Sequence, residues 1–242
     1  MAKKGETKSQ KALSVPVVRH LRRKDRAWTA KIIPGPHNRE RAVPLVFIIR
    51  DMMKLAGNEK EVRHILQHCK VSVNGTQRRE VRFPVGLFDV VEIAEAKKKC
   101  RAVFDVKGRL VLKDIAGKDK PMKLCKVLRK HTMKGGKQQL TLDDGATLVD
   151  EKNAVKVGST LKLELPGRKV LEVLELKKGN LVYITQGTHI GTVAQINDVI
   201  EGTMSRPKLI SLKSRGESAE EFQTVEKNVL VVGTKKPEVE VE

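Results

Sequence analysis

The sequence predicts a multidomain α+β protein in which a small helical region precedes a long series of short strands. Residues 45–56 carry apolar side chains at the spacing of one helical face, and residues 58–69 repeat that spacing after Gly57. From residue 103 onward, short apolar segments alternate with Gly- and Asp-rich turns, which is typical of β structure. A chain of 242 residues is long for one small module, so two or three domains are expected.

The charge balance indicates the class of partner. Lys and Arg number 49 against 29 Asp and Glu, which gives a formal net charge of +20. A polyanion lowers the self-repulsion of such a chain, and RNA is the commonest polyanion. A thermophile-like surface is the alternative interpretation, but such surfaces usually carry nearly balanced charge. Aromatic residues are only 3% of the chain, which argues against a single-strand binder built on base stacking and favours contacts with phosphates and helix shape.

The helical region carries its own start and stop signals. Pro44 suits the first turn of a helix, where its missing N–H is no loss, and Gly57 is expected to end that helix. Asn58 can cap the second helix, with Glu61 three residues on to complete a capping box. Each helix has one apolar face, so both are expected to share a core and to leave a mostly cationic face outside.

A small sheet is expected to complete this core. Val71 and Val73 alternate with polar residues, and Asn74-Gly75 is the strongest short-range hairpin signal. Further strands are expected through residues 81–83 and 90–93.

Several segments of this region match a known pattern. Arg41 opens the first helix, Arg63 lies on the second, and Val71-Ser72-Val73-Asn74-Gly75 is followed by a closing segment at 86–91. With these features residues 39–93 resemble the S-four RNA-binding domain. The strings at 35–41 and 83–90 are more specific and resemble the archaeal and eukaryotic S-four-e family, small-subunit ribosomal protein four of the e type, in its shorter archaeal form.

One position departs from the pattern. Cys69 stands where such domains usually place glycine after the second helix. If that position requires a positive φ, cysteine costs roughly 1 kcal/mol relative to glycine.

An all-β region follows. Its first part has strands expected at 103–106, 109–112, 123–128, 139–142, 147–149 and 161–165. Within it, segments 123–127 and 135–145 resemble the central domain of the same family. Its second part has strands expected at 170–176, 181–185, 193–196 and 209–212, with a last strand near Phe222 and 229–232.

A glycine-containing loop lies in the second β region. Gly187 and Gly191 flank His189 in a loop that enters a strand, and this resembles the KOW motif of small SH3-like barrels. Glycine there would let the backbone approach a phosphate or a partner chain, since no Cβ intervenes.

The expected domain order has five parts. They are a basic N-terminal arm (1–41), an S-four-type RNA-binding domain (42–97), a central β domain (98–170), a KOW SH3-like barrel (171–215) and a C-terminal extension with a frayed acidic tail (216–242).

The arm is expected to order against RNA, with short ordered pieces at residues 19–23 and 28–33. It carries 12 cations against three acidic residues and has too few apolar residues to fold alone. Trp28 is its expected anchor. Packing on a neighbouring domain is favoured over stacking on a base, and both uses draw on a flat amphipathic ring. His37, in the rigid turn that ends the arm, either contacts phosphate or makes a structural hydrogen bond.

Catalytic and metal-binding patterns are sparse in the sequence. It has no Walker loop, Gly-x-Ser-x-Gly elbow or His-Glu-x-x-His. His64, His68 and Cys69 offer too few ligands for zinc, and Asp143-Asp144 precedes Gly145, where turn geometry explains the carboxylates. Three cysteines without a CxxC pair fit reduced thiols in the cytoplasm, and no apolar run is long enough to span a bilayer. No cofactor and no metal are expected.

Two alternatives come from other classes. S-four modules also occur in pseudouridine synthases, and residues 108–111 superficially resemble their active-site segment, but Val111 replaces the aspartate nucleophile. A free KOW-containing transcription or translation factor is disfavoured by the long basic arm.

The resemblance implies a structural constituent of the small ribosomal subunit, not an enzyme, in the cytoplasm. Its partners would be small-subunit rRNA and neighbouring ribosomal proteins, with no membrane and no homo-oligomer. Arg41 and Arg63 stand out because arginine can hold two phosphate oxygens at once. The residues predicted to contact RNA are Arg19, Arg22, Arg23, His37, Arg39, Arg41, Arg63, Lys70, Asn74, Arg78, Arg79, Arg82, Lys97, Lys98, Lys99, Gly187, His189 and Gly191.

Overall fold

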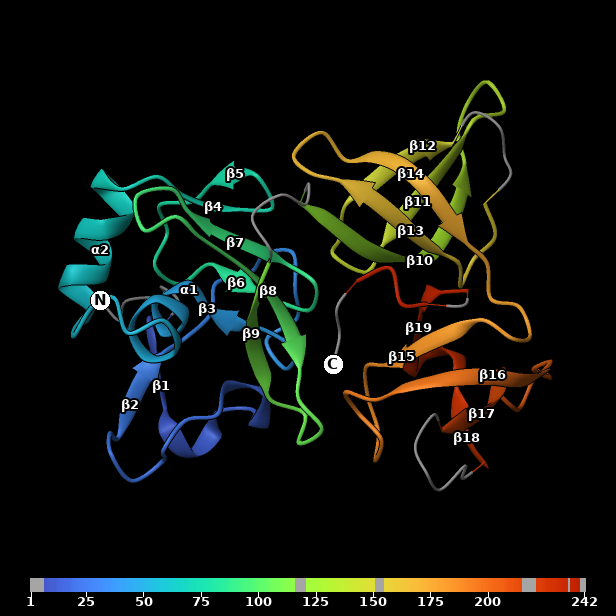
Figure 1. Ribbon diagram of the computed structural model, residues 1–242, viewed down its shortest axis with the longest axis horizontal. Coiled ribbons are helices and arrows are strands. Elements are labelled where there is room, and N and C mark those ends of the chain that lie inside the picture. Colours follow the sequence, from blue (N-terminus) through green and yellow to red (C-terminus); the bar gives the residue numbers. More distant parts are fainter. Residues whose placement is uncertain (1–6, 116–120, 151–154, 215–220, 235, 240–242) are drawn as a thin grey trace, which may run out of the picture. The chain divides into compact units, whose positions relative to one another are not determined.

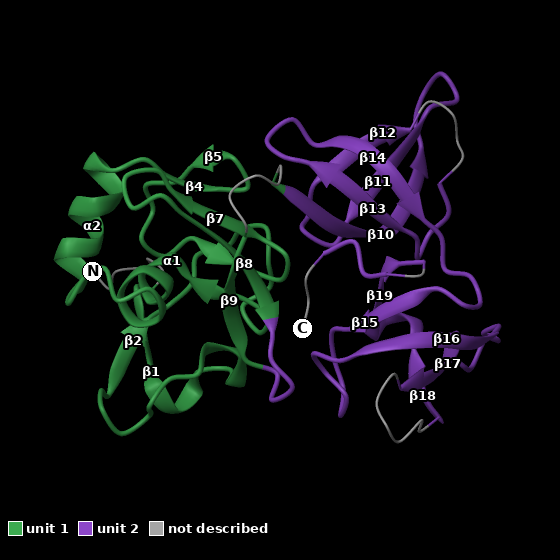
Figure 2. Cartoon of the chain, viewed as in Figure 1, with its two compact units in different colours: residues 1–103, 109–121 green, residues 104–108, 122–242 purple. Residues whose placement is uncertain are grey.

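The structure, a computed structural model, describes residues 7–115, 121–150, 155–214, 221–234 and 236–239 (Figure 1). It is mostly β with few helices, so the predicted α+β class is confirmed in this coarse form. The chain divides into two compact units, residues 1–103 with 109–121 (unit 1) and residues 104–108 with 122–242 (unit 2) (Figure 2).

Unit 1 is built on a five-stranded sheet. Its strand order is β5-β4-β7-β8-β9, comprising β4 (Val71–Val73), β5 (Thr76–Gln77), β7 (Val90–Ile93), β8 (Lys98–Phe104) and β9 (Leu110–Asp114). Asn74 and Gly75 both have positive φ, at 55° and 74°, and join β4 to β5, which confirms the predicted hairpin.

The lysine run after β7 is part of this sheet. Lys97 lies in a turn with φ of 49°, and the chain then returns as β8, pairing Ile93 with Lys98 and Val90 with Arg101. The central β domain was expected to begin at residue 98. Residues 98–103 and 109–114 instead lie with the helical module, because β8 hydrogen-bonds to β7.

The first helix is shorter than predicted. One α-helical turn, α1 (Leu45–Phe47), runs into a π-helical turn, η3 (Ile48–Met52), which closes with a bond from Met53 N to Ile48 O at 2.8 Å. Lys54 then adopts φ of 54°, so the helix ends before the expected Ala56. Residues 81–83, which were expected to form a strand, instead accept hydrogen bonds from the first turn of this helix. Leu45 N donates to Phe83 O and Val46 N to Val81 O, both at 2.9 Å.

The second helix, α2 (Glu59–His68), has the predicted cap. Asn58 Oδ1 accepts from Glu61 N at 3.0 Å, and Glu61 Oε2 accepts from Gly57 N at 2.6 Å. Cys69, the residue after α2, is extended with φ of −88°. That position therefore does not require glycine, and the expected penalty for cysteine does not arise.

The N-terminal arm is folded, contrary to the prediction. From residue 7 onward it forms a two-stranded ribbon, β1 (Ser9–Lys11) with β2 (Trp28–Ala30), linked through the 3-10 helices η1 (Ala12–Ser14) and η2 (Val17–Arg19). Its few apolar residues suffice because Ala12, Val15 and Ile32 are all buried within unit 1. A short pairing of β3 (Val43–Pro44) with β6 (Pro84–Val85) follows.

The first sheet of unit 2 is antiparallel, in the order β12-β11-β10-β13-β14. It comprises β10 (Met122–Thr132), β11 (Gln138–Leu142), β12 (Thr147–Asp150), β13 (Thr160–Glu164) and β14 (Lys169–Leu174). Its core gathers apolar side chains from its strands and the adjoining loops: Cys125, Val127, Leu140, Leu142, Ala146, Val155, Leu161 and Leu163. The expected boundary at residue 170 falls inside β14, which pairs with β13.

The second sheet of unit 2 has the order β18-β17-β16-β15-β19. It comprises β15 (Leu181–Ile184), β16 (Val193–Ile200), β17 (Leu209–Ser214), β18 (Glu221–Val225) and, after the turn η4 (Glu226–Asn228), β19 (Val229–Gly233). Residues 221–233 were expected to belong to a C-terminal extension. Instead, the two strands in this segment, β18 and β19, complete the sheet whose other strands were expected at 171–215. Lys126 Nζ donates to Val229 O at 2.7 Å, joining the two sheets.

The predicted frayed tail, residues 237–242, is wrong for residues 237–239. Glu238 N donates to Val232 O at 2.9 Å, Lys162 Nζ lies 2.5 Å from Glu238 Oε2, and Val239 is buried. Residues 240–242 of the expected tail lie outside the described residues. Two contacts hold the acidic segment in place: Glu238 pairs with Lys162 of β13, and the next residue, Val239, is buried.

Candidate nucleic-acid interface

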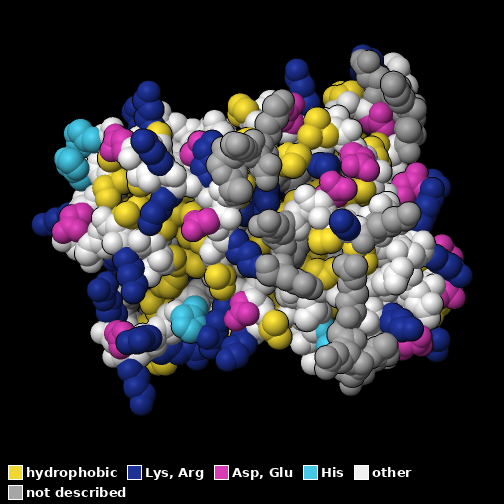
Figure 3. Space-filling view, viewed as in Figure 1, with side chains coloured by type: hydrophobic (Ala, Val, Ile, Leu, Met, Phe, Trp, Pro, Cys, Tyr) yellow, Lys and Arg dark blue, Asp and Glu magenta, His cyan; other side chains and the backbone are white. Residues whose placement is uncertain are grey.

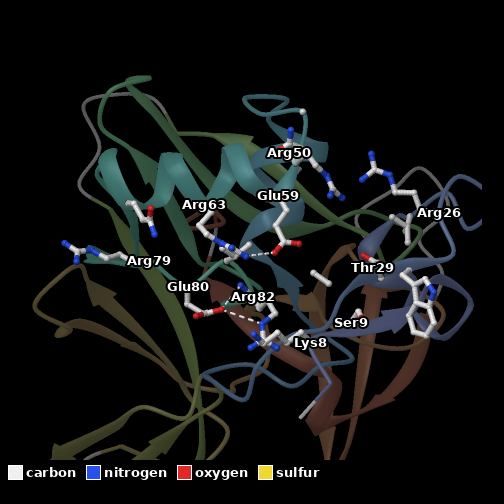
Figure 4. Close-up of a pocket in the computed structure, with 17 residues that line it drawn as sticks. Lys8, Ser9, Arg26, Thr29, Arg50, Glu59, Arg63, Arg79, Glu80 and Arg82 are labelled. Atoms are coloured by element: carbon white, nitrogen blue, oxygen red, sulfur yellow. Dashed lines mark hydrogen bonds and ion pairs between the residues drawn. The ribbon is translucent and has the colours of Figure 1, made fainter. Parts of the chain in front are cut away.

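Unit 1 contains a groove of about 760 Å³ with a strongly basic lining (Figure 4). Four parts of the chain form it: the ribbon of β1 and β2 with its flanking residues, the π-helical turn η3, helix α2 with the turn before it, and the loop at 79–82. Six cationic side chains line it, against the two carboxylates of Glu59 and Glu80. These cations are Lys8, Arg26, Arg50, Arg63, Arg79 and Arg82.

Neighbouring acids hold some of these arginines. Arg63 Nη2 lies 3.1 Å from Glu59 Oε1 one turn earlier on α2, and Arg82 Nε lies 3.6 Å from Glu80 Oε1. Both pairs are drawn as dashed lines in Figure 4, where Arg63 and Arg82 converge on the same space. Arg50 makes a two-pronged pair with Asp51, at 2.6 and 3.0 Å. The Arg63–Glu59 pair is exposed on both sides, and exposed pairs of this kind are weak and exchange readily for other anions.

The remaining three groove cations have a simpler environment. Within the part of the chain that the structure describes, Lys8, Arg26 and Arg79 form no ion pair. Figure 3 shows Lys and Arg side chains gathered around the region of β1 and β2. Cations that lack a local acid keep their full attraction for an incoming phosphate.

The predicted RNA contacts are distributed over several surfaces. Arg63, Arg79 and Arg82 line the groove, whereas Arg78 stacks over the Phe83 ring at 4.6 Å. Arg22 and Arg23 line a second, smaller hollow of about 200 Å³ that also includes Arg109. Other predicted cations are exposed on unit 1 away from both hollows, namely Arg39, Arg41, Lys70, Lys97 and Lys98, and Lys99 pairs with Glu92 at 2.8 Å.

Arg19 is a correction to the predicted interface. Its side chain is buried, at 1% exposure, and donates to Ala30 O at 3.2 Å and Ala42 O at 3.4 Å. Burial, aided by the charge of Arg39, lowers the pKa of Arg19 to about 10, so the guanidinium stays protonated near neutral pH. A buried guanidinium has no surface for a phosphate, and Arg19 instead ties β2 to the body of unit 1.

His37 and Asn74 also serve the fold. His37 Nε2 lies 2.7 Å from Asp89 Oδ2, Asn74 Nδ2 donates to Asp89 Oδ1 at 2.7 Å, and Val90 N donates to Asn74 Oδ1 at 2.9 Å. Asp89 is fully buried, and its Oδ2 also accepts from Gly86 N at 2.9 Å. Of the two interpretations of His37, the structure thus favours the structural hydrogen bond.

The glycine loop of unit 2 is packed on its own chain. A Cβ on Gly191 would lie 2.7 Å from the carbonyl carbon and oxygen of Asp105, and Gly191 has φ of 82°. This glycine therefore admits the backbone of Asp105, where the sequence suggested a phosphate or partner. Gly187 has open space beside it, and His189 stacks on Phe222 with ring centroids 4.2 Å apart.

Sequence reasoning did not single out Lys8, Arg26 and Arg50 as contacts. The first two counted only toward the charge of the arm, and Arg50 lies in the π-helical turn η3. Their convergence with Arg63 depends on the ribbon folding beside α2, which no local spacing reveals.

Other polar clusters have structural explanations. Cys125, Asp143 and Asp144 lie close enough to hold a cation, but Lys123 Nζ already lies 2.9 Å from Asp144 Oδ2. Burial alone would raise the pKa of Asp144; the Lys123 ammonium, the Ala146 amide and Arg168 together hold that pKa below its ordinary value. His64 and His68 stack on each other at 4.1 Å on the exposed face of α2. No helix of the described residues is long and apolar enough to cross a membrane.

A groove lined by six cations and two carboxylates is typical of proteins that bind polyanions. Comparison with known proteins narrows this class. The chain is 38% identical to the small ribosomal subunit protein eS4 of Methanosphaera stadtmanae, over 98% of this chain and 97% of the relative. It is 38% identical to that of Methanocaldococcus jannaschii, over 98% of each.

A solved structure and a family model agree with these relatives. The crystal structure of the 30S ribosomal protein S4e from Thermoplasma acidophilum matches with a TM-score of 0.67 and 33% identity, over 80% of this chain and 96% of that chain. The family model described as Ribosomal family S4e matches residues 96–170. This chain belongs to the S4e family of ribosomal proteins. The predicted resemblance is thereby confirmed, and the family is one of structural proteins, not of enzymes.

Proposed function

We propose that this chain is a structural constituent of the small ribosomal subunit and binds rRNA through the basic groove of unit 1. Membership of the S4e family is the observation that carries the assignment, since the relatives are named as small ribosomal subunit proteins. They give no support to an RNA-modifying enzyme or a free KOW-type factor. The partners would be small-subunit rRNA and neighbouring ribosomal proteins in the cytoplasm, with one copy of the chain in each particle.

The groove supplies the mechanism. Six cations that converge on one hollow can neutralise several phosphates, and the release of their counterions favours binding. Arginines at Arg63, Arg79 and Arg82 can each hold two phosphate oxygens, while Lys8 acts as a mobile point charge. We infer that Arg22 and Arg23 extend this contact along the second hollow.

The finer domain assignment is also a proposal. Unit 1 would contain the S-four-type module, with α2, the Asn74-Gly75 hairpin and strands β8 and β9. The two sheets of unit 2 would be the central β domain and a KOW-type SH3-like barrel, the latter completed by β18 and β19. What supports the barrel is a Gly187–Gly191 loop that leads into β16.

Sedimentation tests the ribosomal assignment. The tagged full chain should travel with small subunits in a lysate gradient and stay bound through a high-salt wash that strips loosely held factors. A chain found wholly at the top of the gradient at both salt concentrations would contradict the proposal.

A further inference from the structure

Trp28 is unusual among the aromatic residues of this chain. The five Phe, one Tyr and one Trp all lie in the described part, and Trp28 alone is more than half exposed, at 57%. Its counterparts Phe47, Phe83, Phe88, Phe104 and Tyr183 are buried, and Phe222 is half-buried. The sequence predicts that Trp28 packs on a neighbouring domain, but within unit 1 Trp28 remains more than half exposed. An indole left in water loses the burial that stabilises the other rings, so its position points to a use outside the fold.

Trp28 is one of several ribbon residues that line the groove, with Ser9, Thr29 and Ala30. Trp28 pairs with Lys11 and Ala30 pairs with Ser9, so Trp28, Ala30 and Ser9 share one face of the ribbon. All three line the groove. Figure 4 shows Ser9, Lys8 and Arg26 bordering the same hollow. The indole thus forms part of the wall of a cationic groove.

The strand that carries Trp28 is held rigidly. Backbone bonds extend the ribbon beyond its strands, from Ala12 N to Ala27 O at 2.9 Å and from Lys31 N to Lys8 O at 3.0 Å. The buried Arg19 fixes the far end of β2 by donating to Ala30 O. An aromatic ring on such a support loses little freedom when a ligand stacks on it.

We propose that Trp28 is a stacking platform for one unpaired base of the RNA that occupies the groove, with Lys8 and Arg26 holding the adjacent phosphates. The inference rests on the proposed function and specifies its ligand. Bases inside an A-form helix are covered on both faces, so only a base from a bulge, loop or end can stack on the indole. The groove, at about 760 Å³, lies in the range of sites that enclose a ligand larger than one nucleotide base. Every base has a π face, so the platform would accept any of the four.

The surroundings of Trp28 favour RNA over a protein neighbour. A docking site for an apolar protein segment would line the groove with further apolar side chains. The exposed Leu13 and Val17 of the arm do not line it, and among its lining residues only Leu21 and Val81 are large and apolar besides Trp28. Here the flanking groove side chains include Lys8 and Arg26, which form no ion pair among the described residues. An aromatic ring with unneutralised cations beside it is the combination that single-stranded nucleic acid binds.

Because Trp28 is the sole tryptophan, its fluorescence reports on stacking directly. The purified full chain is titrated at low salt with a blunt-ended RNA duplex carrying one bulged adenosine, and with the same duplex without the bulge. We expect the bulged RNA to quench the emission and the uninterrupted duplex to leave it nearly unchanged. Trp28→Ala should weaken binding of the bulged RNA about tenfold or more, Trp28→Phe should weaken it less, and neither should change binding of the duplex.

Four outcomes overturn the inference. They are equal emission with both RNAs, equal affinity of Trp28→Ala and wild type for the bulge, an equal loss on both RNAs, or an emission change that appears only when small-subunit proteins are added. Thermal unfolding of both variants excludes a folding defect as the cause. If the wild-type chain binds both RNAs with salt-dependent affinity, the proposed function stands even when the stacking fails. Failure to bind either RNA, or small-subunit rRNA, contradicts the proposed function itself.

Discussion

Nε2 of His37 lies 2.7 Å from Oδ2 of Asp89, and this bond joins the turn that ends the N-terminal arm to the residue just before β7. Asp89 also binds Asn74 and the amide of Gly86, so one buried carboxylate fixes the arm, the hairpin and the approach to β7. A fully buried carboxylate is stable only when such partners surround it. The two strings that carried the family resemblance, 35–41 and 83–90, thus meet at this bond.

Gly86→Ala tests the packing around this network. A Cβ at Gly86 would lie 2.4 Å from Cγ of the His37 ring, which cannot move without breaking the bond to Asp89. We expect the free energy of unfolding of unit 1 to fall by about 1–3 kcal/mol, measured by urea denaturation. Gly57→Ala is the matched control, because the nearest atom to its Cβ is a Glu61 oxygen at 3.5 Å. Equal stability of the two variants would contradict the role given to the His37 ring.

Much of the fold was predictable because it depends on local patterns. The Asn58–Glu61 cap, the Asn74-Gly75 turn and nearly every strand of unit 2 follow from capping, turn and alternation rules. The pairing of β8 with β7 could not be predicted in the same way. A lysine run looks like a solvated linker until its neighbours in the sheet are known, and sheet order is set by contacts distant in sequence.

The candidate site was predicted less well, for a related reason. The count of charges identified a basic arm, but it cannot distinguish Arg19, which is buried in the core, from Arg26, which lines the groove. Burial separates them, and burial depends on how the ribbon packs on unit 1. His37 and Asn74 likewise carry side chains that suit RNA, but their hydrogen bonds to a buried aspartate are visible only in three dimensions.

Asp144→Asn tests the buried ion pair of unit 2. At pH 7 the variant leaves the Lys123 ammonium without this carboxylate, and we expect a loss of about 3–5 kcal/mol in the free energy of unfolding. The pKa of Asp144 is lowered in the folded state, so its stabilising contribution is complete above the unfolded pKa, near 4, and disappears as the pH falls through the folded pKa. Urea unfolding of wild type and variant at pH 7 and pH 3 should therefore show a difference that shrinks in acid. A difference that stays constant would contradict this account.

Arg63→Glu tests the helix side of the groove. Reversal of the charge places a second carboxylate opposite Glu59 and repels phosphate, so affinity for small-subunit rRNA in a filter-binding titration should fall about tenfold or more. The fold should persist, because the Arg63 side chain is exposed. Arg63→Gln removes the charge without adding repulsion and should lose less. Arg129→Glu, an exposed change on β10 of unit 2, is the control for net charge. Equal losses for Arg63→Glu and Arg129→Glu would show that only total charge matters.

Tyr183→Phe tests a buried hydrogen-bonded hydroxyl. In the wild type the Tyr183 hydroxyl donates to Phe104 O at 2.9 Å and accepts from Phe104 N at 3.0 Å, and burial raises the pKa of Tyr183. The substitution keeps the ring but removes both bonds to buried backbone groups. We expect a loss of about 1–3 kcal/mol in the free energy of unfolding of unit 2, measured by urea denaturation. An unchanged urea midpoint would show that these bonds contribute nothing net.

The salt dependence of rRNA binding tests the central claim most directly. The triple variant Lys8→Gln, Arg26→Gln and Arg79→Gln removes the three groove cations that form no ion pair within the described residues. If these side chains neutralise phosphates, a plot of log affinity against log salt should be steep for the wild type and shallower by about two to three units for the variant. A variant whose slope and affinity equal those of the wild type would place the RNA elsewhere and contradict the account.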